Sequence, residues 1–334
     1  MSLRHHSTLS QIAVLLGFMT GVGLIAYLEL RRLLFAWINR RENPKPGFWP
    51  GAGARAERAL TRCLHAVSVL GMGCVLYGWL WEPTDIEVVT VPVLSAKIRP
   101  ESGVIRIVHV SDLHSDPGPL NEPAAARMIR GLNPDIIVVT GDFINTEGGL
   151  PVARDFIRSL TQTATTFLVT GNFDIGRLPK GAFAGLPAKV LDLETAEVRV
   201  RGTPLRITGF AVETEPLFSR YRRHLVSGPA YDIFLSHYTD LADEAAQAGI
   251  DLYLAGHTHG GQVRLPFYGA LVTLAKTGKR FEAGLYRVAD MVLYVNRGLG
   301  LEGGRAPRVR FLCRPEITVL ELRNTPRAAA QSPR

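Results

Sequence analysis

The segment Ile107–His114 (IVHVSDLH) is an apolar run that ends in two side chains able to bind metal, Asp112 and His114. Four later apolar runs end in residues of the same kind, namely Gly141-Asp142, Gly171-Asn172, His237 and Gly256-His257-Thr258-His259. Short runs of Val, Ile, Leu and Phe are typical of buried strands. Because ligand sites in open α/β sheets lie beyond the carboxyl ends of strands, we expect these side chains to converge.

Further apolar runs extend the pattern of alternating strand and helix. Strands are expected at residues 104–110, 135–140, 166–170, 205–210, 232–236 and 250–255, and again within 284–295 and 310–322. Between the first two, Asn121–Gly131 (NEPAAARMIRG) has a proline near its start and a glycine at its end, as many helices do. We therefore predict the fold class as α/β, a layered α/β sandwich over residues 104–322.

The candidate ligands are two carboxylates, one amide and four imidazoles: Asp112, His114, Asp142, Asn172, His237, His257 and His259. Mixed nitrogen and oxygen ligands suit Mn, Fe or Zn, and the set contains no thiolate. These are too many ligands for one tetrahedral ion, so we expect two ions that share a bridging aspartate. In an extended chain, side chains two residues apart point the same way, which would pair Asp112 with His114 and His257 with His259. Such a centre attracts a phosphate and supplies a nucleophile at neutral pH.

The five motifs, in this order, resemble the calcineurin-like metallophosphoesterase superfamily, in particular its bacterial membrane-associated or exported branch. Gly256–Pro266 (GHTHGGQVRLP) and Asn296–Gly300 (NRGLG) are similar to that branch. The resemblance implies a phosphoesterase with two divalent ions, manganese favoured, and attack by a metal-bridging hydroxide. It assigns Asp112, His114 and His259 to one metal, Asn172, His237 and His257 to the other, and the bridge to Asp142. It also implies that Asp142, Asn172 and His237 are catalytic.

One position departs from the family pattern, which has Gly-Asn-His followed by an acid. Here the stretch is Gly171-Asn172-Phe173-Asp174. The family's histidine supports the transition state or the leaving group, whereas phenylalanine neither donates a proton nor carries charge. Loss of a positioned acid costs ~10²–10⁴ in rate. Either the substrate has a good leaving group, such as the phosphate half of a pyrophosphate, or activity is weak. A metal-binding, non-catalytic membrane protein is the alternative from another class.

Two apolar stretches, Leu9–Leu28 and Cys63–Trp81, come before the predicted domain. As helices, each is long enough to cross the ~30 Å hydrocarbon core of a bilayer. The segment Arg31–Arg62 between them carries eight basic and two acidic residues, which favours a cytoplasmic loop. We predict a two-pass transmembrane hairpin over residues 1–82 in the cell membrane, with helices at about 9–28 and 63–81. A linker over 83–103, an extracytoplasmic catalytic domain and a disordered tail over 323–334 would follow. A cleaved signal peptide is the alternative for the first stretch.

The net charge of +8 is concentrated in the membrane region, since residues 1–82 carry nine Lys/Arg against four Asp/Glu. The chain lacks the basic, aromatic-rich stretches of single-strand binders, so we expect no nucleic-acid partner. Arg264 and Arg297 are candidate phosphate contacts, and Leu265–Tyr268 is expected either in the core or against acyl chains or membrane. The expected substrate is a phosphorylated small molecule or a lipid-linked phosphoester or pyrophosphate. A broad extracytoplasmic phosphodiesterase or phosphatase is the alternative, and the sequence does not indicate the oligomeric state.

Overall fold

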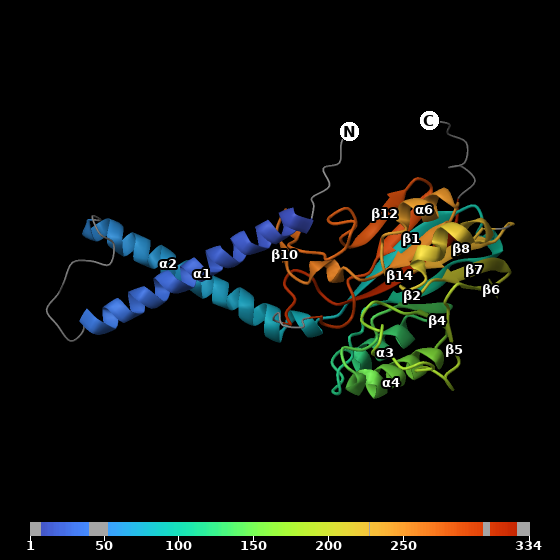
Figure 1. The fold of residues 1–334 in the computed structure, drawn as a ribbon, viewed down its shortest axis with the longest axis horizontal. Coiled ribbons are helices and arrows are strands. Elements are labelled where there is room, and N and C mark those ends of the chain that lie inside the picture. The colour runs from blue at the N-terminus through green and yellow to red at the C-terminus, as the bar shows by residue number, and fades with distance from the viewer. Residues whose placement is uncertain (1–7, 40–52, 227, 303–307, 326–334) are drawn as a thin grey trace.

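The computed structural model describes residues 8–39, 53–226, 228–302 and 308–325. Two long helices, α1 (Thr8–Asn39) and α2 (Ala54–Leu80), come first, and Figure 1 shows them crossing beside a domain of strands and short helices. His65 Nδ1 of α2 lies 3.0 Å from Glu29 Oε1 of α1. The two predicted apolar stretches therefore form helices that contact each other.

By length and composition, one helical segment among the described residues, Arg55–Thr84, can cross a membrane. It includes the second predicted span. The two-pass hairpin and its orientation remain predictions. The ends of the predicted loop Arg31–Arg62 belong to α1 and α2, and its middle, residues 40–52, lies outside the described residues. The second helix leads without a long connection through the 3-10 helix η1 (Glu82–Thr84) into the first strand.

Two six-stranded sheets form the body of the domain. The first has the order β1-β14-β2-β3-β4-β5, with β1 (Glu87–Ser95), β14 (Glu316–Asn324), β2 (Ile105–Val110), β3 (Ile136–Thr140), β4 (Thr165–Val169) and β5 (Ala188–Val190). The second has the order β12-β13-β9-β8-β7-β6, with β12 (Gly284–Val288), β13 (Met291–Val295), β9 (Leu252–Ala255), β8 (Tyr231–Leu235), β7 (Thr203–Gly209) and β6 (Glu194–Val200). The strands β2, β3 and β4 are mutually parallel, as are β7, β8, β9 and β13, so within each set the carboxyl ends share one edge.

Smaller elements complete the domain. The helices are α3 (Glu122–Gly131), α4 (Leu150–Thr161), α5 (Phe218–Tyr221) and α6 (Ala242–Gln247). The 3-10 helices are η2 (Pro100–Ser102), η3 (Glu147–Gly149), η4 (Glu215–Leu217), η5 (Arg222–His224) and η6 (His259–Gly261). A small hairpin, β10 (Arg264–Leu265) and β11 (Gly269–Ala270), follows the last ligand motif.

The core consists of three apolar layers, because successive side chains of a strand point to opposite faces of its sheet. Ile107 of β2 packs between the two sheets with Leu254 of β9, whereas the next residue, Val108, packs on the outer face with residues of α3 and α4. The outer face of the second sheet is covered by α5 and α6, whose side chains pack on Phe234 and Tyr253. The layers therefore run helix, sheet, sheet, helix, and the predicted layered α/β sandwich is confirmed.

The segment predicted to be a linker contains one strand of the first sheet. Within residues 83–103, β1 pairs in parallel with β14 along its whole length. Pro92 lies within β1, and an edge strand tolerates a proline because one side of its backbone has no partner strand. The predicted strand region 284–295 forms two strands joined by a tight turn. The predicted strand region 310–322 begins later than expected, because β14 starts at Glu316 and residues 310–315 are irregular chain that approaches α2. The predicted disordered tail, residues 323–334, begins too early, because β14 continues to Asn324 through its pairing with β1; residues 326–334 lie outside the described residues.

Candidate metal centre

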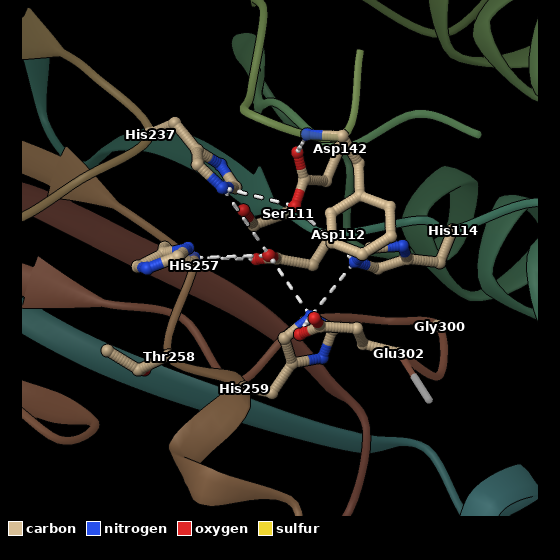
Figure 2. A network of polar contacts seen from close by, with 12 residues as sticks. Ser111, Asp112, His114, Asp142, His237, His257, Thr258, His259, Gly300 and Glu302 are labelled. Atoms are coloured by element: carbon tan, nitrogen blue, oxygen red, sulfur yellow. Dashed lines mark hydrogen bonds and ion pairs between the residues drawn. The ribbon is translucent and has the colours of Figure 1, made fainter. Parts of the chain in front are cut away.

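The seven predicted ligands follow five strands, three in the first sheet and two in the second. Asp112 and His114 follow β2, Asp142 follows β3, Asn172 follows β4, His237 follows β8, and His257 and His259 follow β9. Figure 2 shows the two aspartates facing the histidines that come from both sheets. The site therefore lies where the carboxyl ends of the strands in the two sheets meet, as expected for α/β folds.

Two groups of three buried side chains each bring their ligand atoms within 4.8 Å of one another: Asp112, His114 and His259, and Asp112, Asp142 and His237. In the first, His259 Nε2 lies 3.3 Å from Asp112 Oδ1 and 3.0 Å from His114 Nε2. In the second, His237 Nε2 lies 3.2 Å from Asp142 Oδ2 and 4.0 Å from Asp112 Oδ1. Each group therefore places oxygen and nitrogen ligand atoms close enough together to hold one ion.

Two further predicted ligands lie beside the second group. Asn172 Oδ1 is 3.0 Å from His237 Nε2. The ring centroid of His257 is 5.2 Å from that of His237, and the His257 backbone N–H donates to the Asp112 carboxylate at 3.1 Å. The structure thus brings all seven predicted ligands into one cluster, with His257 at its edge.

Both aspartates are placed between the two sets of ligands. Asp142 Oδ2 lies 3.4 Å from His114 Nε2 and 3.2 Å from His237 Nε2, one histidine from each predicted set. Asp112 belongs to both groups of three. The assignment of the bridge to Asp142 therefore stays a prediction, with Asp112 equally well placed to be shared.

The backbone at the site is strained. Five of the seven predicted ligands have a left-handed φ between 44° and 69°: Asp112, His114, Asp142, His257 and His259. Residues with a Cβ rarely adopt this region because of steric clashes, and such strain gathers at functional sites. The expectation that the paired ligands converge through an extended chain was wrong, because both pairs turn toward the site through left-handed backbone.

Burial and mutual charge perturb the pKa values of the ligands. Burial raises the pKa of Asp112, and nearby Asp142 adds to this against the opposing effect of His237. Burial also opposes charge on Asp142, but His237 and His114 outweigh it and hold the pKa well below its ordinary value. Asp142 likewise outweighs burial at His237 and raises its pKa to about 10. Burial, aided by His237, lowers the pKa of His257 to about 3. His257 is therefore neutral at neutral pH, whereas His237 must release a proton to bind a metal.

Comparison with known proteins identifies the family of this site. Residues 105–261 match the family model for the calcineurin-like phosphoesterases. The chain is 31% identical over 266 residues to the Uncharacterized metallophosphoesterase YkuE of Bacillus subtilis (strain 168), an alignment that covers 75% of this chain and 90% of that protein. The chain belongs to the calcineurin-like phosphoesterases. The superfamily predicted from the five motifs is thereby confirmed.

Two other relatives of this calcineurin-like phosphoesterase have informative names. Phosphodiesterase YaeI of Escherichia coli (strain K12) is 30% identical over 238 residues, covering 68% of this chain and 85% of that protein. The Transmembrane protein with metallophosphoesterase domain of Bos taurus is 29% identical over 276 residues, covering 73% of this chain and 58% of that protein. The similarity therefore includes one relative named as a phosphodiesterase and one named as a transmembrane protein.

The residues present fit the divalent ions that calcineurin-like phosphoesterases use. Asp112 and Asp142 are buried side by side, and burying two carboxylates together is unfavourable unless cations compensate them. The loops around them leave no room for larger residues: a Cβ at Gly171 would overlap Asp142 Oδ1, and one at Gly256 would overlap Asp112 Oδ2. Oxygen and imidazole donors suit Mn, Fe or Zn without selecting among them.

Phe173, which replaces the usual histidine of the family, lies against the ligands. Its ring makes an edge contact with His114, with centroids 4.7 Å apart, and its backbone N–H donates to Asp142 Oδ1 at 2.8 Å. The Arg177 guanidinium lies over the Phe173 ring, 4.9 Å from its centroid. An apolar ring therefore stands beside the centre at the position where the sequence resemblance predicts a proton donor.

Several supporting residues were not predicted from the sequence. Asn145 Oδ1 lies 2.9 Å from His114 Nδ1, so it orients a predicted ligand from behind. The carboxylate of Asp174 accepts backbone N–H groups from Asp142, Phe143 and Gly171 at 2.8–3.0 Å, which joins the loops after β3 and β4. Asn145 comes three residues after Asp142 in the chain, and this closeness in sequence was the one signal that could have predicted its place near the metal ligands.

Glu302 was also missed, although Figure 2 shows it beside His259. Its Oε2 lies 3.8 Å from His259 Nε2, and burial raises its pKa. It comes shortly after the Asn296–Gly300 stretch, whose Gly300 N–H donates to the Asp112 carbonyl at 2.8 Å. That stretch therefore supports the metal centre through its backbone.

The two predicted phosphate contacts are engaged with the protein's own groups. Arg297 pairs with Glu316 and with Glu87, the latter at 2.7 Å. Arg264 donates to the Gly260 carbonyl at 2.9 Å and pairs with Glu282 at 3.3 Å. Contact of either arginine with substrate stays a prediction, and it would require these pairs to open or be shared.

Proposed function

We propose that this calcineurin-like phosphoesterase is a membrane-anchored hydrolase of phosphodiester or pyrophosphate bonds that works with two divalent metal ions. The observation that carries the proposal is the pair of Asp/His groups that share buried Asp112 at the strand ends. A single Asp/His group could belong to a structural site for one metal ion, whereas two such groups that share a carboxylate suit two ions side by side. The name of the relative YaeI, a phosphodiesterase, supports the same class of reaction.

The residues of the centre divide the work between holding ions and orienting one another. Asp112, His114 and His259 would hold one ion, Asn172, His237 and His257 the other, and Asp142 would be shared. When bound, two such ions polarise a phosphoryl oxygen and lower the pKa of water. The Thr140 carbonyl, 2.7 Å from His237 Nδ1, fixes the ring so that Nε2 faces the site. Asn145 does the same for His114.

Phe173 restricts which leaving group can depart. Its ring stands 4.7 Å from that of His114 and cannot donate a proton. A substrate whose leaving group is stable without protonation, such as one half of a pyrophosphate or an acidic phenol, therefore suits the site. An alkoxide leaving group would lack the ~10²–10⁴ that a positioned acid contributes.

The proposed anchor is α2, and the catalytic domain is proposed to lie on the extracytoplasmic side. The apolar segment Arg55–Thr84 and the transmembrane relative from Bos taurus support an anchor. The basic segment Arg31–Arg62 supports the orientation through the positive-inside rule. Reporter fusions after Trp81 test this, because a reporter active only in the cytoplasm would contradict the proposed side.

The reaction class is tested with a panel of substrates presented to the full chain in detergent with Mn²⁺. The panel holds bis-p-nitrophenyl phosphate, p-nitrophenyl phosphate, an alkyl phosphodiester and a lipid-linked pyrophosphate. We expect the aryl diester and the pyrophosphate to be cleaved and the alkyl diester to be slow. Preference for the alkyl diester would contradict the role given to Phe173, and preference for the monoester would favour a broad phosphatase.

Phe173 also motivates a second candidate, a metal-binding membrane protein without catalytic activity. Phe173→His separates the two, with Phe183→His, at a buried ring that contacts Phe143, as a folding control. A large gain of turnover from an inactive parent would indicate a site that has lost its acid. Turnover in the parent that falls in the variant would indicate a site adapted to phenylalanine.

A further inference from the structure

The β10–β11 hairpin projects an apolar side chain from the surface of the domain. Its strands pair Arg264 with Ala270 and Leu265 with Gly269, which leaves a loop of Pro266, Phe267 and Tyr268. Phe267, at the tip, is fully exposed. The hairpin therefore exposes the Phe267 ring at the surface of the domain instead of burying it in the core.

Phe267 is unfavourable at this position for two separate reasons. Exposure of a large apolar ring forgoes the stabilisation that burial would give. Its φ of +63° lies in the left-handed region, where a bulky residue is strained and glycine or asparagine is preferred. Packing within the domain does not explain a residue that has both a strained backbone and an exposed ring, and such a residue indicates an external contact.

The hairpin is connected to the end of α2 by backbone hydrogen bonds. The Arg264 N–H of β10 donates to the Phe311 carbonyl at 2.9 Å. The preceding residue, Arg310, donates its backbone N–H to the Gly78 carbonyl of α2, also at 2.9 Å. The Phe311 ring meets the Tyr77 ring edge-on, with centroids 6.3 Å apart. Figure 1 places β10 on the side of the domain nearest the two long helices.

The end of α2 has the composition of a membrane interface. Tyr77, Trp79 and Trp81 are all exposed there, and Trp and Tyr gather at the level of lipid headgroups. Leu312, next to the Phe311 that contacts α2, is exposed as well. The domain therefore adds an exposed apolar side chain beside the exposed aromatic end of α2.

We propose that the β10–β11 hairpin is a second membrane contact, with Phe267 inserted into the interfacial region of the bilayer that α2 crosses. This inference rests on the membrane anchor proposed above and adds a point of attachment to it. The hairpin begins five residues after His259, and Arg264 Nη1 holds the Gly260 carbonyl. Attachment at two points would therefore hold the metal centre at a fixed tilt close to the headgroups, where a lipid-borne phosphate lies.

The test places a fluorescent label at the hairpin tip of the full chain. Phe267→Cys is made in a parent with Cys63→Ala and Cys74→Ala, leaving the buried Cys313 in place. The protein is labelled with an NBD maleimide and reconstituted into vesicles of phosphatidylcholine and phosphatidylglycerol. Val190→Cys is the matched control, since Val190 is an exposed apolar residue on β5, which Figure 1 places away from α2. Unlabelled parent supplies the background, and flotation of the vesicles reports on the anchor.

We expect the label at 267 to be severalfold brighter and blue-shifted, quenched by doxyl-labelled phospholipid and shielded from iodide, with the label at 190 showing the reverse. A label at 267 that iodide quenches as readily as the one at 190, in protein that floats with the vesicles, would overturn the hairpin contact alone. Shielding from both quenchers would overturn it in favour of a second copy of the chain covering Phe267. Failure to float would overturn the anchor, and the hairpin contact with it, while leaving the phosphoesterase activity to be judged separately.

Discussion

Asp174 joins the two loops that carry Asp142 and Asn172, so its removal is a sensitive test of how the centre is held. Its buried carboxylate accepts three backbone N–H groups, from Asp142 at 3.0 Å, Phe143 at 2.9 Å and Gly171 at 2.8 Å. Asp174→Asn keeps the size but replaces one acceptor oxygen with an NH2 donor. At least one N–H must then face a donor.

An unsatisfied buried N–H costs about 1–3 kcal/mol, and burying the NH2 group of asparagine without an acceptor adds to this. We therefore expect Asp174→Asn to lower the free energy of unfolding at pH 5 by roughly 2–4 kcal/mol. In a domain of this size that corresponds to a fall in Tm of about 5–15 °C. Affinity for Mn²⁺ should also fall by about 10–100-fold, as for other residues that orient ligands.

The assay is thermal unfolding of the full chain in detergent, with Mn²⁺ titrated in a second experiment. Thermal unfolding is measured at pH 5 and pH 8, because burial and nearby Asp142 raise the pKa of Asp174 to about 6. Ionisation of Asp174 therefore costs the folded state stability as the pH rises from 3.8 through 6, and the loss caused by Asp174→Asn should be larger at pH 5 than at pH 8. Asp155→Asn is the control, since that carboxylate is exposed on α4 and pairs with Arg158 on the same helix. If Asp174→Asn matched Asp155→Asn in both Tm and metal affinity, the role given to Asp174 would be refuted.

Two further substitutions test separate parts of the structure. Burial raises the pKa of Glu215 to about 7 from an ordinary 4.5, although the hydrogen bond from Ser236 opposes this shift. The folded state therefore prefers the protonated carboxyl, and the protein loses stability as the pH rises from 4.5 through 7. Relative to wild type, Glu215→Gln should be neutral at pH 4 and more stable at pH 8, by up to about 3 kcal/mol; an equal difference in unfolding free energy at both pH values would contradict this. Gly256→Ala places a methyl group against Asp112 Oδ2 and Ser111 Oγ, and we expect a loss of roughly 10² in metal-dependent turnover. Gly118→Ala, where the added methyl meets open space, should retain wild-type turnover, and comparable rates for the two variants would show that the close approach at Gly256 is unimportant.

The strand ends could be predicted because two local signals coincide there. An apolar run of five or six residues needs burial on both faces, and the polar residue that follows it marks the edge of the sheet. Asp112, Asp142 and His237 were recognisable on these grounds. Their distances from one another depend on the packing of two sheets, which apolar periodicity does not specify.

Other features were not predictable because they depend on contacts distant in sequence. β1 is a strand because β14, more than 200 residues later, supplies its hydrogen-bond partners. The left-handed backbone at Asp112 and His259 results from loops that must turn sharply toward a shared site. Leu265–Tyr268 could equally have been core from its composition, and the exposure of Phe267 depends on the hairpin that presents it.

The most direct test of a two-metal phosphodiesterase combines metal content with turnover in one preparation. The full chain is loaded with Mn²⁺, freed of excess metal, and assayed for bound metal and for hydrolysis of bis-p-nitrophenyl phosphate, beside Asp142→Asn and the exposed-site control Asp155→Asn. We predict close to two ions per chain and metal-dependent turnover in the wild type and the control, with both reduced in Asp142→Asn. Wild-type protein that binds two ions yet cleaves none of the substrates in the panel, or Asp142→Asn that turns over at the wild-type rate, would contradict the proposed centre.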